Sequence, residues 1–220
     1  FDPHEAFQKF KTHPFVRRIL DGGKLVRYGA KAVPTGGWYS MPRTYLDGGL
    51  IIGDSAAFLN SQRLKGIHMA LKTGMLAAET IFEALRAGDA SAQTLAAFPR
   101  KVEASWVAKE LRSVRNFHQG FQHGLWTGLA HAAVQFVTGG RGLVDPMRAP
   151  AGHEAYHRLD GAGLAPPRFA GDGKLTFDRL TDVYHSGTRH DEDQPCHLHV
   201  LNTNICVNQC TAEYGNPCQY

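Results

Sequence analysis

The sequence predicts an α+β fold, and three segments of its 220 residues support this class. Residues 49–54, "GLIIGD", form a short apolar run, which is typical of a strand buried on both faces. Residues 66–87 repeat apolar side chains at helical spacing, and residues 200–207 alternate as the start of a β-hairpin does. Both helices and strands are therefore expected, and no internal repeat is visible.

The segment before the apolar run predicts a helix, a strand and a loop. Residues 6–23 have helical spacing and end in a Gly-Gly stop, with Pro14 either breaking or starting a helix. Residues 24–33, "KLVRYGAKAV", alternate loosely and predict a strand. Residues 34–43 contain paired glycines and two aromatic side chains, which indicates a loop.

The helix expected over residues 66–87 carries one apolar stripe and is followed by further helices. Gly88 is its expected stop, and Ser91 is the expected N-cap of the next helix. A long helical stretch is expected over residues 98–117, and the Pro- and Gly-rich residues 147–177 predict a loop or linker. The stripe consists of Ile67, Leu71, Met75, Ala78, Ile81, Phe82 and Leu85.

Composition and charge limit the classes of partner. The hydrophobic content of 43% is ordinary for a soluble globular protein. The formal net charge of +4 favours an anionic partner or an anionic membrane surface and is too weak to indicate nucleic acid. The chain opens on "FDPHEAFQKF" without a signal peptide and stops on a turn-rich stretch, so we expect a piece of a longer protein.

The Gly-Asp pair that ends the apolar run has a possible ligand-binding use. Glycine at position 53 allows backbone to approach a ligand closely, and the Asp54 carboxylate can accept hydrogen bonds from sugar or ribityl hydroxyls. "KGIH" at residues 65–68 opens the following helix, whose free N–H groups can bind an electron-rich oxygen. The alternative is structural, with Asp54 as a cap or turn residue and Gly53 as a tight bend.

Two long stretches resemble one family of redox enzymes. "GGWYSMPRTYLDGGLIIGDSAAFLNSQRLKGIHMALKTGMLAAE" at residues 36–79 and "DQPCHLHVLNTNICVNQCTAEYGNPCQY" at residues 193–220 resemble the electron transfer flavoprotein–ubiquinone oxidoreductases. The resemblance runs in order over nearly the whole chain. It implies a monotopic membrane enzyme with FAD, one [4Fe-4S] cluster and ubiquinone as substrate. Electrons would arrive singly from reduced electron transfer flavoprotein and leave as a pair for the quinone.

The resemblance also implies particular site residues. Asp54 would bond the FAD ribityl chain beside Gly53, and the backbone of Gly66, Ile67 and His68 would face the flavin or its pyrophosphate. A helix N-terminus there would stabilise negative charge on reduced flavin. Electron transfer requires no side-chain acid or base, so no catalytic residue is expected. The protein would lie peripherally on a bacterial cytoplasmic membrane or on the matrix side of the mitochondrial inner membrane.

The same resemblance divides the chain into five parts. The FAD part would be the closing strand and helix of a Rossmann-like domain, without the Gly-rich fingerprint of its opening half. We therefore expect the isolated chain to bind FAD weakly and to be inactive. The expected parts are a quinone-side domain at residues 1–47, the FAD part at 48–90, a helical membrane-facing segment at 91–146, a linker at 147–194 and the start of a ferredoxin-like iron–sulfur domain at 195–220.

Four cysteines cluster near the end of the chain with the spacing C-x9-C-x3-C-x7-C. One interpretation gives all four thiolates to a single cluster. The other makes them flanking residues, because no C-x2-C pair is present and the resemblance places the cluster ligands in a "FCPAxVYE"-like segment and a later C-x2-C-x2-C, beyond Tyr220. We favour the second, so none is expected to bind metal. The four are Cys196, Cys206, Cys210 and Cys218.

Two histidine patterns are explained without a metal site. "HEAYH" at residues 153–157 matches H-E-x-x-H, a zinc protease pattern that needs a helix and a third ligand. Pro150, Gly152 and Gly161 leave room for a brief helix only, so we interpret the match as chance. His197 and His199 alternate along the expected strand and are expected on the surface rather than as metal ligands.

Residues 116–140 contain no Asp, Glu, Lys or Arg, and this uncharged segment is long enough to span a membrane. Six His and Gln side chains make a span costly, so an amphipathic helix lying in the interface fits better. A core helix is the alternative. Gly120, Gly124 and Gly128 offer a small-residue face for another helix. The apolar stripe is Phe117, Phe121, Leu125, Leu129, Ala133 and Phe136 or Val137, flanked by Arg112, Arg115, Arg141 and Arg148.

Three functions remain open from sequence. The first is part of the flavin and iron–sulfur quinone reductase. The second is a membrane-peripheral docking module that does no chemistry. The third is a related flavoprotein reductase without quinone, similar to geranylgeranyl reductases. The Gly-Asp stretch fits the first and the third, and residues 201–219 favour the first.

Overall fold

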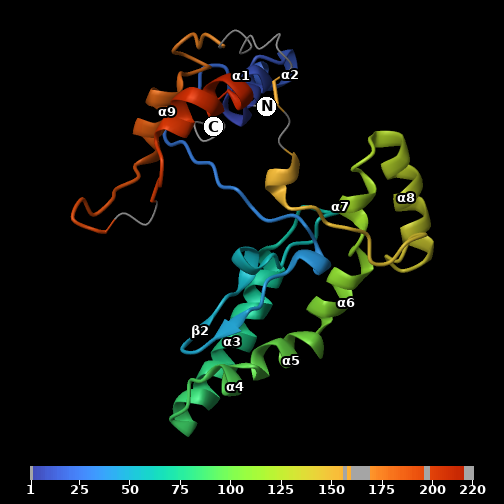
Figure 1. Ribbon diagram of the computed structural model, residues 1–220. Helices are drawn as coiled ribbons and strands as arrows, with labels where there is room; N and C mark the ends of the chain where they lie inside the picture. The colour runs from blue at the N-terminus through green and yellow to red at the C-terminus, as the bar shows by residue number, and fades with distance from the viewer. Residues whose placement is uncertain (1, 156–157, 160–168, 196–198, 216–220) are drawn as a thin grey trace. The chain divides into compact units, whose positions relative to one another are not determined.

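The computed structural model describes residues 2–155, 158–159, 169–195 and 199–215, and the chain divides into two compact units (Figure 1). Unit 1 comprises residues 1–31 and 151–220, and unit 2 comprises residues 32–150. Described residues are mostly helical, with one two-stranded antiparallel sheet. This agrees with the α+β class, while the five-part division stays a prediction.

Unit 2 begins with a small hairpin and continues in helices. Strand β1 (Tyr45–Leu46) pairs with β2 (Gly49–Leu50), and the 3-10 helix η2 (Gly53–Ala56) follows. The helices are α3 (Ile67–Ala87), α4 (Ala92–Leu95), α5 (Ala97–Glu103), α6 (Trp106–Ser113), α7 (Phe117–Gly120) and α8 (Leu125–Val137), and a 3-10 turn, η1 (Trp38–Ser40), precedes the hairpin.

The prediction of α3 is confirmed at both ends. Gly66 is the N-cap, and Gly88 ends the helix with φ +66°, a left-handed conformation that suits glycine. Its predicted apolar stripe, however, faces outward in unit 2, with Ile67 81% and Leu85 72% exposed. Thr73 and Thr80 lie on the buried face. Each hydroxyl is satisfied there because it donates a hydrogen bond of 2.8 Å to the carbonyl oxygen one turn earlier.

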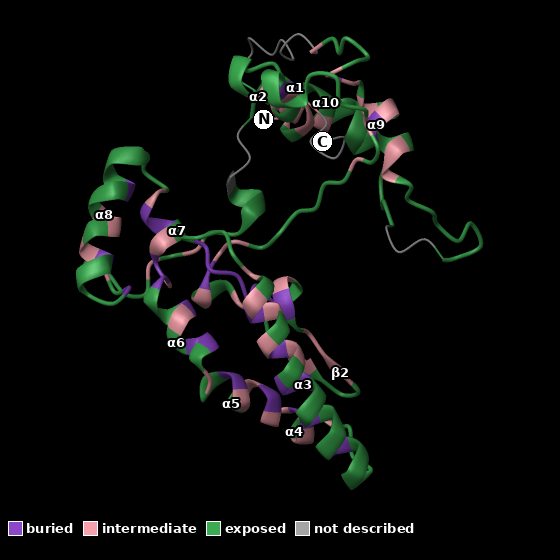
Figure 2. Cartoon of the chain, turned by 180° about the vertical axis from the view of Figure 1, so that it is seen from behind, coloured by how far each residue is buried: buried purple, intermediate pink, exposed green. Residues whose placement is uncertain are grey.

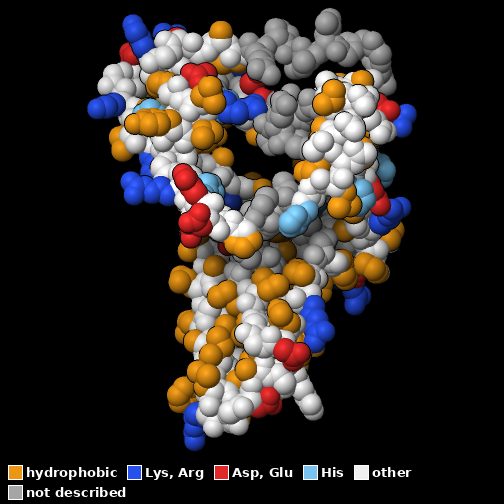
Figure 3. Space-filling model, turned by 60° about the vertical axis from the view of Figure 1, so that its left-hand side comes forward, with side chains coloured by type: hydrophobic (Ala, Val, Ile, Leu, Met, Phe, Trp, Pro, Cys, Tyr) orange, Lys and Arg blue, Asp and Glu red, His pale blue; other side chains and the backbone are white. Residues whose placement is uncertain are grey.

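The core of unit 2 lies between α3, α5, α6 and η2. Phe58 and Phe98 meet edge to face with ring centroids 6.4 Å apart, and both are at most 1% exposed. Met69, Val107 and Leu111 complete the centre. Purple residues in Figure 2 mark these buried faces on α3, α5 and α6, and Figure 3 shows hydrophobic side chains along the surface of the end of unit 2 that holds α3 and β2.

Two predicted strands are wrong, and a third forms only in part. Residues 24–33 contain no strand, and residues 49–54 give only the two strand residues of β2 before η2 begins. Among described residues 199–215, the expected hairpin is a π-helical turn, Cys206–Cys210, that continues into α10 (Thr211–Tyr214). Apolar alternation predicts a strand only where a neighbouring strand accepts its hydrogen bonds, and the described residues offer residues 24–33 and 200–207 none.

Two predicted helices are split. The N-terminal one divides at Pro14 into α1 (Pro3–Lys11) and α2 (Pro14–Leu20), which confirms that Pro14 starts a helix. The stretch over residues 98–117 breaks after α5, where the Ser105 hydroxyl accepts from Val107 N and caps α6.

Unit 1 packs its two sequence-distant parts around a buried carboxylate. Helix α9 (Arg179–Ser186), which begins at the N-cap Asp178, lies in the segment predicted as linker. Its Asp182 is 1% exposed and lies 2.8 Å from His4 Nε2, while Gln8 Nε2 also donates to it at 2.8 Å. Arg179 pairs with Asp2, so α1 and α9 are held by charged contacts as well as by packing.

The predicted single helix over residues 116–140 is two helices. α7 ends at Gly120, and the chain turns at Gly124, whose φ is +102°. α7 and α8 then pack together, because a side chain at Gly128 would collide with the Phe121 ring and a Cβ at Gly120 would lie 3.1 Å from His131 Cβ. The small-residue face therefore joins α7 to α8.

Candidate functional site

The predicted Gly-Asp turn lies against the start of α3. Gly53 has φ +60°, and its N–H donates to the Thr73 hydroxyl at 3.2 Å. A Cβ at Gly53 would lie 3.3 Å from Ala70 Cβ, so the turn approaches α3 closely only as glycine. Asp54 follows within η2 and is half-buried. The structure therefore brings Gly53 and Asp54 beside the first two turns of α3.

The backbone at the start of α3 packs closely against the preceding loop, and no side chain caps this end of the helix. A Cβ at Gly66 would lie 3.0 Å from Leu59 Cδ1 and 3.4 Å from the Phe58 carbonyl oxygen. Ile67, the first helical residue, is 81% exposed. The first-turn N–H groups of α3 are the donors that a helix leaves unsatisfied, and here no side chain takes them.

His68 is held by residues that sequence analysis missed. Its Nε2 lies 3.2 Å from both carboxylate oxygens of Glu110 on α6, and its ring stacks on Trp106 with centroids 5.6 Å apart. Glu110 also accepts from Asn60 Nδ2 at 2.8 Å. One carboxylate thus connects α6 to the loop before α3 and to the first turn of α3. No local signal announces this contact, since Glu110 lies 42 positions from His68.

We expect Glu110 to stabilise the fold in a pH-dependent way. Burial raises the pKa of Glu110, but hydrogen bonds from Asn60 and His68 and the charges of His68 and Arg63 outweigh burial, so the pKa falls below its ordinary value. A lowered pKa in the folded state adds stability above the unfolded pKa, about 4.3, and this is lost as pH falls through the folded value.

Glu110→Gln is therefore expected to lower the free energy of unfolding at pH 7 by about 1 kcal/mol. The difference from the parent protein should shrink below about pH 4, where the parent carboxylate is also protonated. Urea titration at both pH values measures it. A difference that stays constant with pH would contradict the ionised contact.

Helix α8 exposes its apolar side and buries its polar side. At 100° per residue, the apolar residues fall within about a third of the helix circumference. The opposite side carries Gln135, which is 3% exposed and donates 3.2 Å to the Asn116 carbonyl oxygen. Figure 2 shows most of α8 as exposed. The exposed apolar residues are Leu125 (61%), Trp126 (82%), Leu129 (47%), Phe136 (86%) and Val137 (84%).

No helix among the described residues is long and apolar enough to cross a membrane. The described portion of the chain also contains no group of three or more His, Cys, Asp or Glu side chains able to hold a metal ion. Cys206 is exposed and Cys210 is partly exposed, and Cys196, Cys218, His157 and His197 lie outside the described residues. The prediction that the cysteines are not ligands stays a prediction.

Comparison with known proteins identifies a class at each end of the chain. A family model described as "Electron transfer flavoprotein-ubiquinone oxidoreductase, 4Fe-4S" matches residues 173–220. A second, described as "ETF-QO, ubiquinone-binding", matches residues 1–33. The iron–sulfur match begins within the segment that the sequence assigned to a linker. The chain is thus similar to iron–sulfur quinone oxidoreductases at both ends.

The similarity also extends between these ends. Relatives named electron transfer flavoprotein-ubiquinone oxidoreductase include a mitochondrial one of Caenorhabditis elegans, 39% identical over 98% of this chain and 37% of its own length. That of Pseudomonas aeruginosa is 37% identical over 99% of this chain and 40% of its own. The chain belongs to the electron transfer flavoprotein–ubiquinone oxidoreductase family, and it spans well under half the length of these relatives.

Proposed function

We propose that the chain forms part of an electron-transferring-flavoprotein dehydrogenase. Such an enzyme passes electrons from reduced electron transfer flavoprotein through FAD and a [4Fe-4S] cluster to ubiquinone. The observation that carries the proposal is that the spans similar to ubiquinone-binding and iron–sulfur domains pack in one compact unit. His4 and Gln8 from the first span bond Asp182 from the second, so the two parts fold together.

The proposed flavin-binding residues are Gly53, Asp54, Gly66, Ile67 and His68. They fit such a role because η2 and the uncapped start of α3 lie together and a side chain at Gly53 or Gly66 would crowd the space. The Asp54 carboxylate would accept a hydrogen bond from a ribityl hydroxyl, and the N–H groups at the start of α3 would face the electron-rich end of the flavin ring. When bound, FAD supplies the two-electron capacity that quinone reduction needs. The segment is then the closing part of a Rossmann-like domain.

The cluster ligands are proposed to be other residues of the protein. The spacing C-x9-C-x3-C-x7-C contains no C-x2-C pair, which is the usual mark of a cluster loop. We therefore derive no step of electron transfer from these four thiols.

The proposed location is peripheral, on the inner membrane. Several relatives are named mitochondrial. The exposed apolar arc of α8 supports contact with the membrane surface, because a water-facing helix normally exposes its polar side. A ubiquinone reductase must reach a substrate that is dissolved in lipid, so contact with the bilayer serves the proposed reaction.

A ubiquinone-reductase assay on the protein expressed from its full reading frame tests the proposal. Reduced electron transfer flavoprotein is expected to reduce a short-chain ubiquinone only when the enzyme is present. Flavin oxidation by other acceptors without quinone reduction would favour the geranylgeranyl-reductase-like alternative. Membrane binding without flavin or quinone turnover would favour a docking module, which the exposed α8 also supports.

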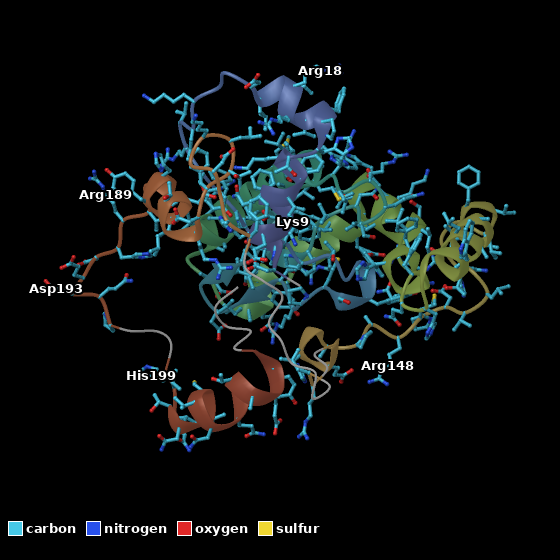
Figure 4. All side chains as sticks on the ribbon, turned by 90° about the horizontal axis from the view of Figure 1, so that it is seen from above. Lys9, Arg18, Arg148, Arg189, Asp193 and His199 are labelled. Carbon is cyan, nitrogen blue, oxygen red and sulfur yellow. The ribbon has the colours of Figure 1, made fainter. Side chains whose placement is uncertain are left out.

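Asp54→Ala in that full-length protein is expected to weaken FAD binding at least about tenfold, because a charge-assisted hydrogen bond is worth about 1.5–3 kcal/mol. Flavin content after gel filtration and fluorescence titration of the apoprotein measure it. Asp193→Ala is the matched control, since Asp193 is exposed on a loop of unit 1 (Figure 4). Equal flavin content in both variants would refute the assignment of Asp54.

A further inference from the structure

An open pocket of about 550 Å³ lies beside the end of α8 in unit 2. Gly140, whose φ is +89°, allows the loop after α8 to meet the end of α6, since a Cβ there would lie 2.5 Å from the Arg112 and Ser113 carbonyl oxygens. The loop thereby brings Arg141 to the arginines of α6 and its C-terminal end. The lining includes Trp38, Tyr39, Arg112, Arg115, Arg141 and Asp145.

Two of the three arginines are committed to the protein. Arg115 Nη2 donates to Asp145 at 2.7 Å, and its Nη1 donates to the carbonyl oxygens of Arg112 at 2.6 Å and Gly139 at 2.9 Å. Arg112 pairs with Glu103 and lies 4.9 Å from the Trp38 ring centroid. These contacts build the pocket wall. They occupy most of the Arg115 guanidinium, whose side chain is 12% exposed, whereas Arg112 has one ion pair and stays 48% exposed.

Arg141 is the cation left over. It is exposed, and within the described residues its guanidinium has no hydrogen-bond or ion-pair partner. The two carboxylates, Asp145 and Glu103, offset two of the three guanidinium charges, so the pocket keeps one positive charge. Asp145 also accepts from Tyr39 at 2.6 Å and from Asn116 at 3.0 Å, which leaves it a weak competitor for Arg141.

Exposed apolar residues stand on both sides of Arg141 along the chain. Phe136 and Val137 precede it, and Leu143 and Val144 follow it, with exposed fractions of 86%, 84%, 78% and 57%. A free guanidinium between such residues matches the boundary between acyl chains and phosphate headgroups. A soluble phosphate ligand has no apolar part that could contact these exposed apolar residues.

We propose that this pocket binds the phosphate of an anionic phospholipid headgroup, with Arg141 as the contacting cation and the flanking apolar residues at the acyl boundary. Guanidinium suits a phosphate because its planar N–H groups can donate two parallel hydrogen bonds. The inference rests on the proposed docking of α8 to the membrane and adds a lipid class to it.

Vesicle flotation tests the inference with two lipid compositions. The chain is mixed with vesicles of phosphatidylcholine alone and of phosphatidylcholine with phosphatidylglycerol. The parent protein should bind the anionic vesicles more tightly, and Arg141→Gln should reduce that preference about fivefold while leaving binding to phosphatidylcholine unchanged. Arg141 is exposed, so the variant should keep the circular dichroism spectrum of the parent.

Arg100→Gln on α5 is the control, because it removes the same charge from an exposed arginine that does not line the pocket. Equal loss in both variants would overturn the pocket and leave a general charge effect. Binding to both vesicle types without an anionic preference would overturn the lipid class but keep the docking. No binding to either vesicle type would overturn both. Inorganic phosphate should not displace the chain from anionic vesicles, and displacement would assign the pocket to a soluble anion instead.

Discussion

Replacing Asn116 with alanine should lower the free energy of unfolding of unit 2 by about 3 kcal/mol. Asn116 is 0% exposed and lies between α6 and α7. Its Nδ2 donates to the Arg141 carbonyl oxygen at 2.9 Å and to Asp145 at 3.0 Å, and its Oδ1 accepts from Met147 N at 2.9 Å. One amide therefore fastens the loop after α8 to the body of unit 2.

The large effect follows from what alanine leaves behind. The partly buried partners would lose their hydrogen bonds to the amide, and each group left buried and unsatisfied costs about 1–3 kcal/mol. Asn116 also accepts at its backbone oxygen from buried Gln135, so loosening the junction would disturb α8. The variant should therefore lose stability together with the native position of α8.

Urea unfolding followed by tryptophan fluorescence measures this loss. All three tryptophans, Trp38, Trp106 and Trp126, lie in unit 2, so the signal reports that unit alone. Asn208→Ala is the control, because Asn208 is exposed in unit 1. A loss below about 1 kcal/mol for Asn116→Ala would mean that water replaces the amide at this junction.

What sequence reasoning could predict depended on where the stabilising partner lies. α3 was predicted well because its boundaries are local, with glycine at each end. Its outward face was not, because burial of Thr73 and Thr80 depends on hydroxyls that bond their own helix and on the packing of α5 and α6. The strand over residues 24–33 failed for the same reason, since a strand requires a partner strand that no local pattern announces. The strand over residues 49–54 formed only at Gly49 and Leu50, where β1 pairs with it.

The candidate site shows the same division. The closeness of Gly53 to α3 follows from a turn before a helix and was predictable. The contacts of Glu110 with His68 and Asn60 join segments far apart in sequence and were not. The break of residues 116–140 into two helices had a visible signal in Gly120 and Gly124, but continuous apolar spacing outweighed it. Apolar residues at helical spacing indicate an apolar helix face. Glycines within such a segment determine whether it forms one continuous helix or breaks into two.

Trp126→Asp and Phe136→Asp should each reduce binding of the chain to phosphatidylcholine vesicles at least about tenfold, since burying a large apolar side chain contributes about 1.5–3 kcal/mol. Trp126 and Phe136 are 82% and 86% exposed and lie on the apolar arc of α8. Because neither side chain is buried in unit 2, the substitutions should leave stability nearly unchanged.

The control must separate docking by α8 from the general adhesion of exposed apolar side chains. Leu85→Asp serves this purpose, since Leu85 is 72% exposed on α3 and lies outside the arc. Flotation should fall for the α8 variants and stay at the parent level for Leu85→Asp, and Trp126→Phe should keep binding because it keeps an aromatic surface. If Leu85→Asp reduced flotation as strongly as Trp126→Asp, the chain would adhere through any exposed apolar side chain. Only a selective loss makes α8 the membrane-facing surface, because only then does the position of the apolar side chain matter and not merely its exposure.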